Sequence, residues 1–339
     1  LREWRPENAG AAARRGAARR GGTMAGAPGA ADPDTMQNEY VHHQAEQGVF
    51  AGPTELTVGT WNLLHPTYAV KYREVEGIYG RTKSNWPDRA PEIGDRLLKG
   101  GLDVYLLQEV GQAQLDDLQP YVSQLYELRF AAHPGRGAKD GVAVLVRKAR
   151  LQIEEDHTLE ILAKEKDLKG QHYMSAMLVT ARDVATGARV LAVSAHFYAK
   201  KAVDPRGTLL AELARRFAGD NPPELVVWGG DCNEVYRAPF FGGAFCTADG
   251  RCPTRFRGTK KIDWIFVGGA ALSGVVRSEA TQKFVKASSE AILATGQPPS
   301  DHLAEAVSIR MRCDCDARAG AADLRAGTCC ASRSCVCTC

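Results

Sequence analysis

The stretch LVVWGGDCNE, Leu225–Glu234, runs from an apolar segment into polar residues. Its apolar residues predict a buried strand, and the pair Gly229–Gly230 leads directly to Asp231 and Asn233. Acids and amides are costly inside a protein core unless they are paired or bind a metal ion. The stretch therefore predicts a buried strand that presents an acid and an amide at its end.

Several other apolar runs begin or end with polar residues of the same kinds. The strands predicted from LTVGTWN, DVYLLQE and RVLAVSAH end at Asn62, Glu109 and His196, the strand KIDWIFV carries Asp263 near its start, and the last strand directly follows Asp301 and His302. Strand ends of a β-sandwich lie along a common edge. These residues are therefore expected to form one cluster of carboxylates, amides and imidazoles.

The segment between residues 54 and 311 alternates short apolar runs with helical patterns. Helices are predicted at DRAPEIGDRLLKGG, where Ile93, Leu97 and Leu98 have helical spacing, and at GTLLAELARRFAG. Strands outnumber helices, and many strands are followed directly by another strand. This order favours the α/β class, with a four-layer α/β sandwich in which two packed mixed β-sheets are flanked by helices.

Composition divides the chain of 339 residues into three parts. Residues 1–53 are rich in Ala, Gly and Arg and are predicted to be disordered, although an Arg-rich, acid-poor leader of this kind can also be an organelle transit peptide. Residues 54–311 form the predicted folded domain. Residues 312–339 hold seven of the ten cysteines and are predicted to be a disordered tail.

Composition also limits the classes of protein to consider. No apolar run is long enough to predict a membrane span. The cysteine-poor body is unlike a disulfide-built secreted scaffold, and an intracellular location in the cytoplasm or nucleus is favoured. The net charge of +3 neither requires nor excludes a polyanionic substrate, because a local cationic cleft is sufficient. The sequence leaves the oligomeric state open.

The expected cluster suits one kind of chemistry. Carboxylate and amide oxygens bind Mg²⁺, with Mn²⁺ as the alternative ion. Such an ion neutralises phosphate oxygens and helps the leaving oxygen depart, so hydrolysis of a phosphate ester is the natural reaction. The Gly229–Gly230 pair is expected to let the backbone pass close to the ion and the phosphate without a clash of Cβ atoms.

Six motifs in this order resemble a known superfamily. The motifs are TWNLL, LLQEV, SAHFYA, GGDCNE, KIDWIFV and SDH, and the chain is identified as a member of the endonuclease/exonuclease/phosphatase superfamily. The stretches SNWPDRAPEIGDRLL, KDGVAVLVRKARLQI and PTRFRGTKKIDWIFV resemble its poly(A) deadenylase and nocturnin branch. The segment between Asn233 and Asp263 is short for a deadenylase.

The resemblance implies a metal and water site. Glu109 is the first choice of metal ligand, with Asn62 beside it, and Asp301 contacts a second ion or a bound water. Asp231 orients or deprotonates the attacking water. Asn233 holds that water or a phosphate oxygen.

The resemblance also implies roles for the histidines and for basic residues. His302 contacts the scissile phosphate, and Asp263 holds its ring. His196 contacts the phosphate or protonates the leaving group, while Lys200 and Arg206 bind the polyanionic substrate. The remaining histidines of the folded part are interpreted as surface or structural residues: His65, His133, His157 and His172.

The function expected from these residues is Mg²⁺-dependent hydrolysis of phosphodiesters. The leading hypothesis is a deadenylase-like exoribonuclease that degrades single-stranded RNA from its 3′ end. A second hypothesis keeps this chemistry but changes the substrate to DNA, inositol phosphate or sphingomyelin. A third is an inactive relative that serves as an RNA-binding or scaffold module, against which the intact set of acids and histidines argues.

Overall fold

A computed structural model gives the fold of the central part of the chain. It describes residues 55–73, 86–134, 139–167, 170–197, 205–233, 245–247, 262–276, 278, 280–286, 300, 302 and 304–311, all within one compact unit. The expected disordered segment 1–53 and cysteine-rich tail 312–339 lie outside these residues. Among the helices that the structure describes, none is both long and apolar enough to cross a membrane.

The first β-sheet contains the earliest strands of the chain. Its order is β11 (Leu272–Val276), β12 (Glu305–Met311), β1 (Glu55–Asn62), β2 (Val104–Val110), β4 (Gly141–Arg147) and β3 (Tyr126–Ala132). β1 and β2 are parallel, and the other neighbours are antiparallel. The sheet is therefore mixed, with the parallel pair at its centre.

The second β-sheet is built in a similar way. Its order is β5 (Leu151–Asp167), β6 (Gly170–Asp183), β7 (Arg189–Ala195), β8 (Leu225–Asp231), β10 (Asp263–Gly268) and β9 (Phe245–Thr247). Here β7 and β8 form the parallel pair, and the other neighbours are antiparallel. Strand β8 is the strand predicted from LVVWGGD, and it is buried along its whole length.

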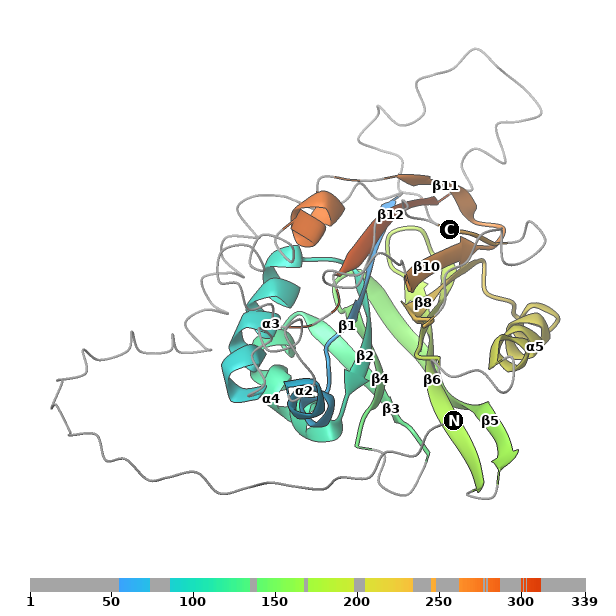
Figure 1. Cartoon of the computed structure of the whole chain (residues 1–339). Coiled ribbons are helices and arrows are strands. Elements are labelled where there is room, and N and C mark those ends of the chain that lie inside the picture. The colour runs from blue at the N-terminus through green and yellow to red at the C-terminus, as the bar shows by residue number, and fades with distance from the viewer. Residues whose placement is uncertain are drawn as a thin grey trace, which may run out of the picture. The chain divides into compact units, whose positions relative to one another are not determined.

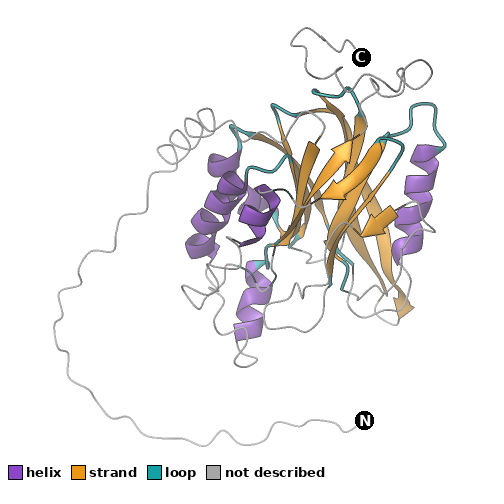
Figure 2. Ribbon diagram, turned by 90° about the horizontal axis from the view of Figure 1, so that it is seen from above, coloured by secondary structure: helices purple, strands orange, loops and turns teal. Residues whose placement is uncertain are grey.

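The two sheets pack face to face and carry helices on their outer faces (Figures 1 and 2). An apolar layer between the sheets includes Val58 and Leu106 of the first sheet and Val179 and Val227 of the second. Helices α3 (Trp86–Gly100) and α4 (Gln112–Val122) cover the first sheet. Helix α5 (Pro205–Phe217) covers the second, and α2 (Pro66–Arg73) follows β1. The predicted four-layer α/β sandwich is confirmed.

The amphipathic pattern of α3 explains how the outer layer is held. Its residues Ile93, Leu97 and Leu98 are buried against the first sheet, as their helical spacing predicts. The helix is followed by Gly101 with φ 57°, a left-handed conformation that glycine adopts without steric cost. Arg89 is also buried and donates to the carbonyl oxygens of Leu63 and Leu64, which fixes the chain just after β1.

Candidate active site

The first sheet brings three of the expected residues to one edge. Because β1 and β2 are parallel, their carboxyl ends lie side by side, and Asn62 is paired with Gln108, the neighbour of Glu109. β12 runs antiparallel to β1, so the segment before β12 returns to the same edge. That segment carries His302, whose carbonyl oxygen accepts a hydrogen bond from Trp61 Nε1 at 3.1 Å.

The second sheet adds four more of the expected residues. β8 and β10 are antiparallel, and their register places Asp231, the last residue of β8, directly opposite Asp263, the first residue of β10. β7 is parallel to β8, so His196 follows the end of β7 at the same edge. Asn233 lies two residues beyond Asp231, and its backbone N–H donates to Asp231 Oδ1 at 2.8 Å.

An amide joins the acids of the two sheets. Asn62 Nδ2 donates to Glu109 Oε1 at 3.0 Å and to Asp231 Oδ2 at 3.1 Å. Asn62 Oδ1 accepts from the backbone N–H of Leu64 at 2.9 Å, and Glu109 Oε2 accepts from the backbone N–H of His65 at 3.3 Å. Asn62 therefore turns its amide nitrogen, rather than its oxygen, toward the two carboxylates.

Burial perturbs the acid at the centre of the cluster. Asp231 is 2% exposed. Burial raises the pKa of its carboxyl from 3.8 to about 7, with His302 lowering the pKa and Asp263 raising it further. Asp231 is thus a carboxylate that ionises near neutral pH instead of in acid.

The donor set fits a hard divalent cation. Glu109, His196 and Asp231 offer ligand atoms that lie within 4.8 Å of one another. Two carboxylates that share one amide in a largely buried site repel each other when both are ionised, and a divalent cation relieves that repulsion. Glu109 and Asp231 are therefore the side chains that would hold an ion here.

An acid–imidazole pair stands beside the carboxylates. His302 Nδ1 lies 2.8 Å from Asp263 Oδ2 and 3.1 Å from Oδ1, so Nδ1 carries the proton that the carboxylate accepts. His302 Nε2 faces Asp231 Oδ2 at 3.6 Å. The backbone N–H of His302 donates to Ser300 Oγ at 3.1 Å, which fixes the segment before β12. Asp263 thereby sets both the tautomer and the orientation of the ring.

The second imidazole reaches the same acids from the other side. His196 Nε2 lies 3.7 Å from Asp231 Oδ2 and 3.9 Å from Glu109 Oε1. Asn233 Nδ2 lies 3.3 Å from His196 Nε2 and donates to the carbonyl oxygen of Phe197 at 2.8 Å. Burial lowers the pKa of His196 to about 4, so the ring is uncharged at neutral pH.

Strained backbone marks the site. Among the described residues, positive φ at a residue other than glycine occurs only at Leu64 (54°), Glu109 (51°) and Asn233 (51°). Such a conformation is unfavourable for residues with a Cβ atom, and it persists where the surrounding structure requires it. All three residues lie in or next to the cluster, so the fold holds the acid and the amide at an energetic cost.

The two glycines before Asp231 have a different role from the one expected. A Cβ atom on Gly229 would lie 2.5 Å from the carbonyl oxygen of Trp264 on β10. Gly230 has φ 144°, and a Cβ atom there would overlap the carbonyl oxygen of Ala195. The room that glycine provides is thus taken by the neighbouring strands β7 and β10, which approach closely at the end of β8.

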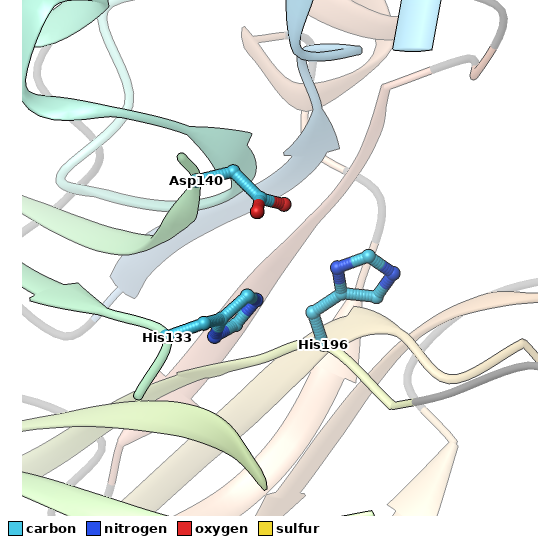
Figure 3. A group of neighbouring side chains, drawn as sticks. All are labelled: His133, Asp140 and His196. Carbon is cyan, nitrogen blue, oxygen red and sulfur yellow. The ribbon is translucent and has the colours of Figure 1, made fainter. Parts of the chain in front are cut away.

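Two further buried residues, neither of them among the expected site residues, lie next to His196 (Figure 3). His133 and Asp140 lie beside the ring of His196, and His133 is only 8% exposed although it was interpreted as a surface or structural residue. The sequence signal for Asp140 is its place directly before the glycine that begins β4, within the stretch KDGVAVLVRKARLQI that resembles the deadenylase and nocturnin branch.

Some expected site residues cannot be placed. Asp301 and Lys200 lie outside the described residues, and only the backbone of Arg206 is described, near the start of α5. The structure therefore brings together Asn62, Glu109, His196, Asp231, Asn233, Asp263 and His302.

The fold and the site together define a hydrolase of phosphate esters. The chain belongs to the Endonuclease/Exonuclease/phosphatase family, whose model matches residues 59–302. No curated protein matches the chain.

Solved structures share the fold. ANGEL2, described as a 2′,3′-cyclic phosphatase, has a TM-score of 0.60 and 16% identity, covering 76% of this chain and 95% of that one. The human Nocturnin catalytic domain has a TM-score of 0.55 and 18% identity, covering 76% and 94%. An endonuclease/exonuclease/phosphatase from Bacteroides vulgatus has a TM-score of 0.55 and 17% identity, covering 76% and 100%. At these identities the likeness shows the fold alone.

Proposed function

We propose that this hydrolase is a Mg²⁺-dependent phosphodiesterase that degrades single-stranded RNA from its 3′ end in a deadenylase-like manner. One observation carries the chemistry of this proposal: Asp231 lies in one cluster with Glu109 and His302, although the three residues come from distant parts of the chain. The substrate rests on the stretches that resemble the poly(A) deadenylase and nocturnin branch.

The metal would be held chiefly by Glu109 and Asp231. A bound Mg²⁺ or Mn²⁺ supplies neutralisation of the phosphate charge and of the developing charge on the leaving oxygen. Asn62 holds the two carboxylates in place through the hydrogen bonds of its amide nitrogen, and its expected role as a direct ligand requires the amide to turn its oxygen toward the ion. Asp301 is proposed as a further ligand.

Asp231 is suited to the proton transfer from the attacking water. In the metal-free protein burial raises the pKa of Asp231 to about 7, and a divalent cation beside the carboxylate favours the ionised form, which is the form that can accept a proton. The backbone N–H of Asn233 fixes the carboxylate through Oδ1, which leaves Oδ2 directed at the cluster. Asp231 therefore accepts the proton as the water oxygen bonds to phosphorus.

The two imidazoles serve the phosphate and the leaving group. Asp263 accepts from Nδ1 of His302, which stabilises the ring when Nε2 takes up a proton and faces a phosphate oxygen. His196 is neutral at neutral pH because of its burial. Its Nε2 lies 3.7 Å from Asp231 Oδ2 and takes up the proton that Asp231 accepted from the water. The protonated ring contacts the phosphate and gives this proton to the leaving oxygen as its bond to phosphorus breaks.

A substrate panel tests the proposal. Labelled poly(A), a mixed RNA, single-stranded DNA, a phosphoinositide, sphingomyelin and a 2′,3′-cyclic nucleotide are each incubated with Mg²⁺ and with chelator. The last substrate is included because ANGEL2 is described as a 2′,3′-cyclic phosphatase. We expect poly(A) to be shortened from its 3′ end with Mg²⁺ and to remain intact with chelator. Preferred hydrolysis of another member of the panel would replace RNA as the substrate.

Variants connect the activity to the site. Glu109→Gln and Asp231→Asn are expected to reduce hydrolysis by at least about 10²-fold, the scale of a lost general base or charge-stabilising group. Glu160→Gln is the matched control, because Glu160 is an exposed acid on β5. If both site variants hydrolyse as fast as the parent while all fold alike, the roles given to Glu109 and Asp231 are wrong.

A further inference from the structure

Three buried side chains form a second polar cluster behind His196 (Figure 3). His133 follows β3, Asp140 directly precedes β4, and His196 follows β7. Their ligand atoms lie within 4.8 Å of one another, and each residue is at most 8% exposed. The cluster therefore lies between the two sheets, on the side of the His196 ring that faces away from Asp231.

The hydrogen bonds of His133 fix the position of its proton. The backbone N–H of Ser175 donates to His133 Nδ1 at 2.9 Å, so Nδ1 presents its lone pair. A neutral imidazole then carries its proton on Nε2. His133 Nε2 is buried and has no hydrogen-bond partner among the described residues, and its N–H is directed toward the cluster.

The hydrogen bonds of His196 fix its proton in the same way. Asn233 Nδ2 donates to the carbonyl oxygen of Phe197 at 2.8 Å, which identifies that atom as the amide nitrogen. The second hydrogen of this nitrogen faces His196 Nε2 at 3.3 Å, so Nε2 accepts and Nδ1 carries the proton. His196 Nδ1 is likewise buried and has no partner in the described part of the chain.

The carboxylate of Asp140 is the third polar group of this cluster, and it can only accept hydrogen bonds when it is ionised. Its Oδ1 accepts from the hydroxyl of Tyr68 at 3.3 Å. Neither ring makes a hydrogen bond or an ion pair with the carboxylate, although the atoms lie within 4.8 Å. The cluster thus has two N–H donors and one carboxylate that surround a common point without touching.

The spacing distinguishes a water molecule from a metal ion. Two groups hydrogen-bonded to the same water at about 2.8 Å lie roughly 4.6 Å apart. Two ligands of a tetrahedral metal ion lie only about 3.4 Å apart. A metal ion also needs a lone pair from each imidazole, whereas His133 Nε2 and His196 Nδ1 both present a hydrogen. A buried water with three polar partners satisfies all the groups.

We propose that His133, Asp140 and His196 bind one water, which accepts from His133 Nε2–H and His196 Nδ1–H and donates to the Asp140 carboxylate. The water keeps His196 in the Nδ1–H tautomer, so that its Nε2 lone pair faces the catalytic cluster. His133 and Asp140 are then positioning residues, because they act on the reaction through His196. This effect on catalysis rests on the proposed function, whereas the water site and the tautomer do not.

Nuclear magnetic resonance of the full chain labelled with ¹⁵N-histidine tests the tautomers directly. We expect a proton on Nε2 of His133 and on Nδ1 of His196 in the parent. Asp140→Asn replaces the acceptor by a group that also donates, so the Nδ1–H form of His196 should be lost or mixed. His133→Phe, which removes the donor, should weaken the same signal, and His133→Gln, which places an N–H₂ near the former Nε2, should restore it.

Activity measurements follow the same variants. Asp140→Asn and His133→Phe are expected to lower kcat by about 10-fold to 100-fold with little change in KM, and His133→Gln is expected to recover most of the loss. His157→Gln is the matched control, because His157 is an exposed histidine on β5. An equal loss in His133→Gln and His133→Phe would overturn the role of the donor.

The remaining outcomes separate this proposal from the proposed function. A parent spectrum with the His196 proton on Nε2 would overturn the water site, because Nδ1 would then be an acceptor. Loss of the Nε2–H signal of His133 when diamagnetic Zn²⁺ is added would overturn it in favour of a metal site. The expected tautomers in a protein that hydrolyses no phosphodiester would support the water site and contradict the proposed function.

Discussion

The buried carboxylate of Asp231 is expected to make the metal-free protein less stable as pH rises. Folding raises the pKa of Asp231 from 3.8 to about 7, mainly because burial disfavours the charged form. The folded state therefore holds a proton that the unfolded state has released between these two values. Asp231 makes its full contribution to the free energy of unfolding below pH 4. This contribution is lost as pH rises through 7.

The magnitude follows from the size of the shift. Each unit of pKa difference corresponds to about 1.4 kcal/mol, so this one group is expected to remove up to about 4 kcal/mol of stability between pH 4 and pH 8. Asp231→Asn removes the titration. The new amide changes the hydrogen bonds to Asn62 and Asn233, but that change is the same at every pH. The prediction therefore concerns the slope of stability against pH.

Urea unfolding with chelator at pH 5, 6, 7 and 8 measures this slope. We expect the free energy of unfolding of the parent to fall relative to that of Asp231→Asn by several kcal/mol across the series. Titrating groups far from Asp231 are common to both proteins and cancel in the difference, so the difference reports Asp231 together with the groups that interact with it. Parallel curves for the two proteins would refute the reasoning, because they would mean that the pKa of Asp231 in the folded protein is that of an ordinary exposed acid.

Three further substitutions test the geometry around the site. Gly230→Ala should lower the free energy of unfolding by at least about 2 kcal/mol, because the residue has φ 144° and its Cβ atom would overlap a carbonyl oxygen of β7; an unchanged urea midpoint would contradict this. Gln108→Leu should cost about 1–3 kcal/mol in the same assay, since the amide is buried and hydrogen-bonded to partners on both sheets, and a more stable variant would show that this bridge is dispensable. Asp263→Asn should lower kcat by about 10²–10⁴-fold, because Nδ1 of His302 loses its negatively charged acceptor and the new amide can also donate to it; a full-rate variant would remove the pair from the mechanism.

Much of the site could be predicted from where the apolar runs end. A strand that is buried along its length, such as β8, can carry an acid only where polar partners or a metal ion compensate the cost of burial, which favours the strand end for Asp231. The same argument places Asn62, Glu109, His196 and Asp263 at strand ends, and the structure shows these ends meeting at one edge. The order of the family's motifs also predicted that these residues form one site. The cost of burying polar groups explains why they lie at strand ends.

Other elements carried weaker signals. Helix α4 has Leu115, Leu118 and Val122 buried on one face, and their spacing in the sequence is helical. Strand β5 is long and rich in charged residues, and it lies at the edge of its sheet, where β6 pairs with it. Edge strands tolerate charge, so an alternating apolar pattern was absent.

Three-dimensional contacts decide the features that the sequence could not reveal. The positive φ of Glu109 contradicts its local preference and arises from the surrounding fold. His133 is an isolated histidine after an ordinary strand, and only the contact of this strand end with β6, which pairs with β7, places it beside His196. The reason for Gly230 likewise lies in a neighbouring strand that is distant in sequence.

The binding of Mg²⁺ to the acids at the strand ends tests the central claim most directly. Thermal unfolding of the chelated protein is followed as Mg²⁺ is added, for the parent, Glu109→Gln and the exposed control Glu160→Gln. Saturation at about 100 times the Kd adds about 2.7 kcal/mol to the free energy of unfolding, so Tm should rise in the parent and the control and stay unchanged in Glu109→Gln. An equal rise in all three proteins, or none in the parent, would contradict a metal-binding site built on Glu109.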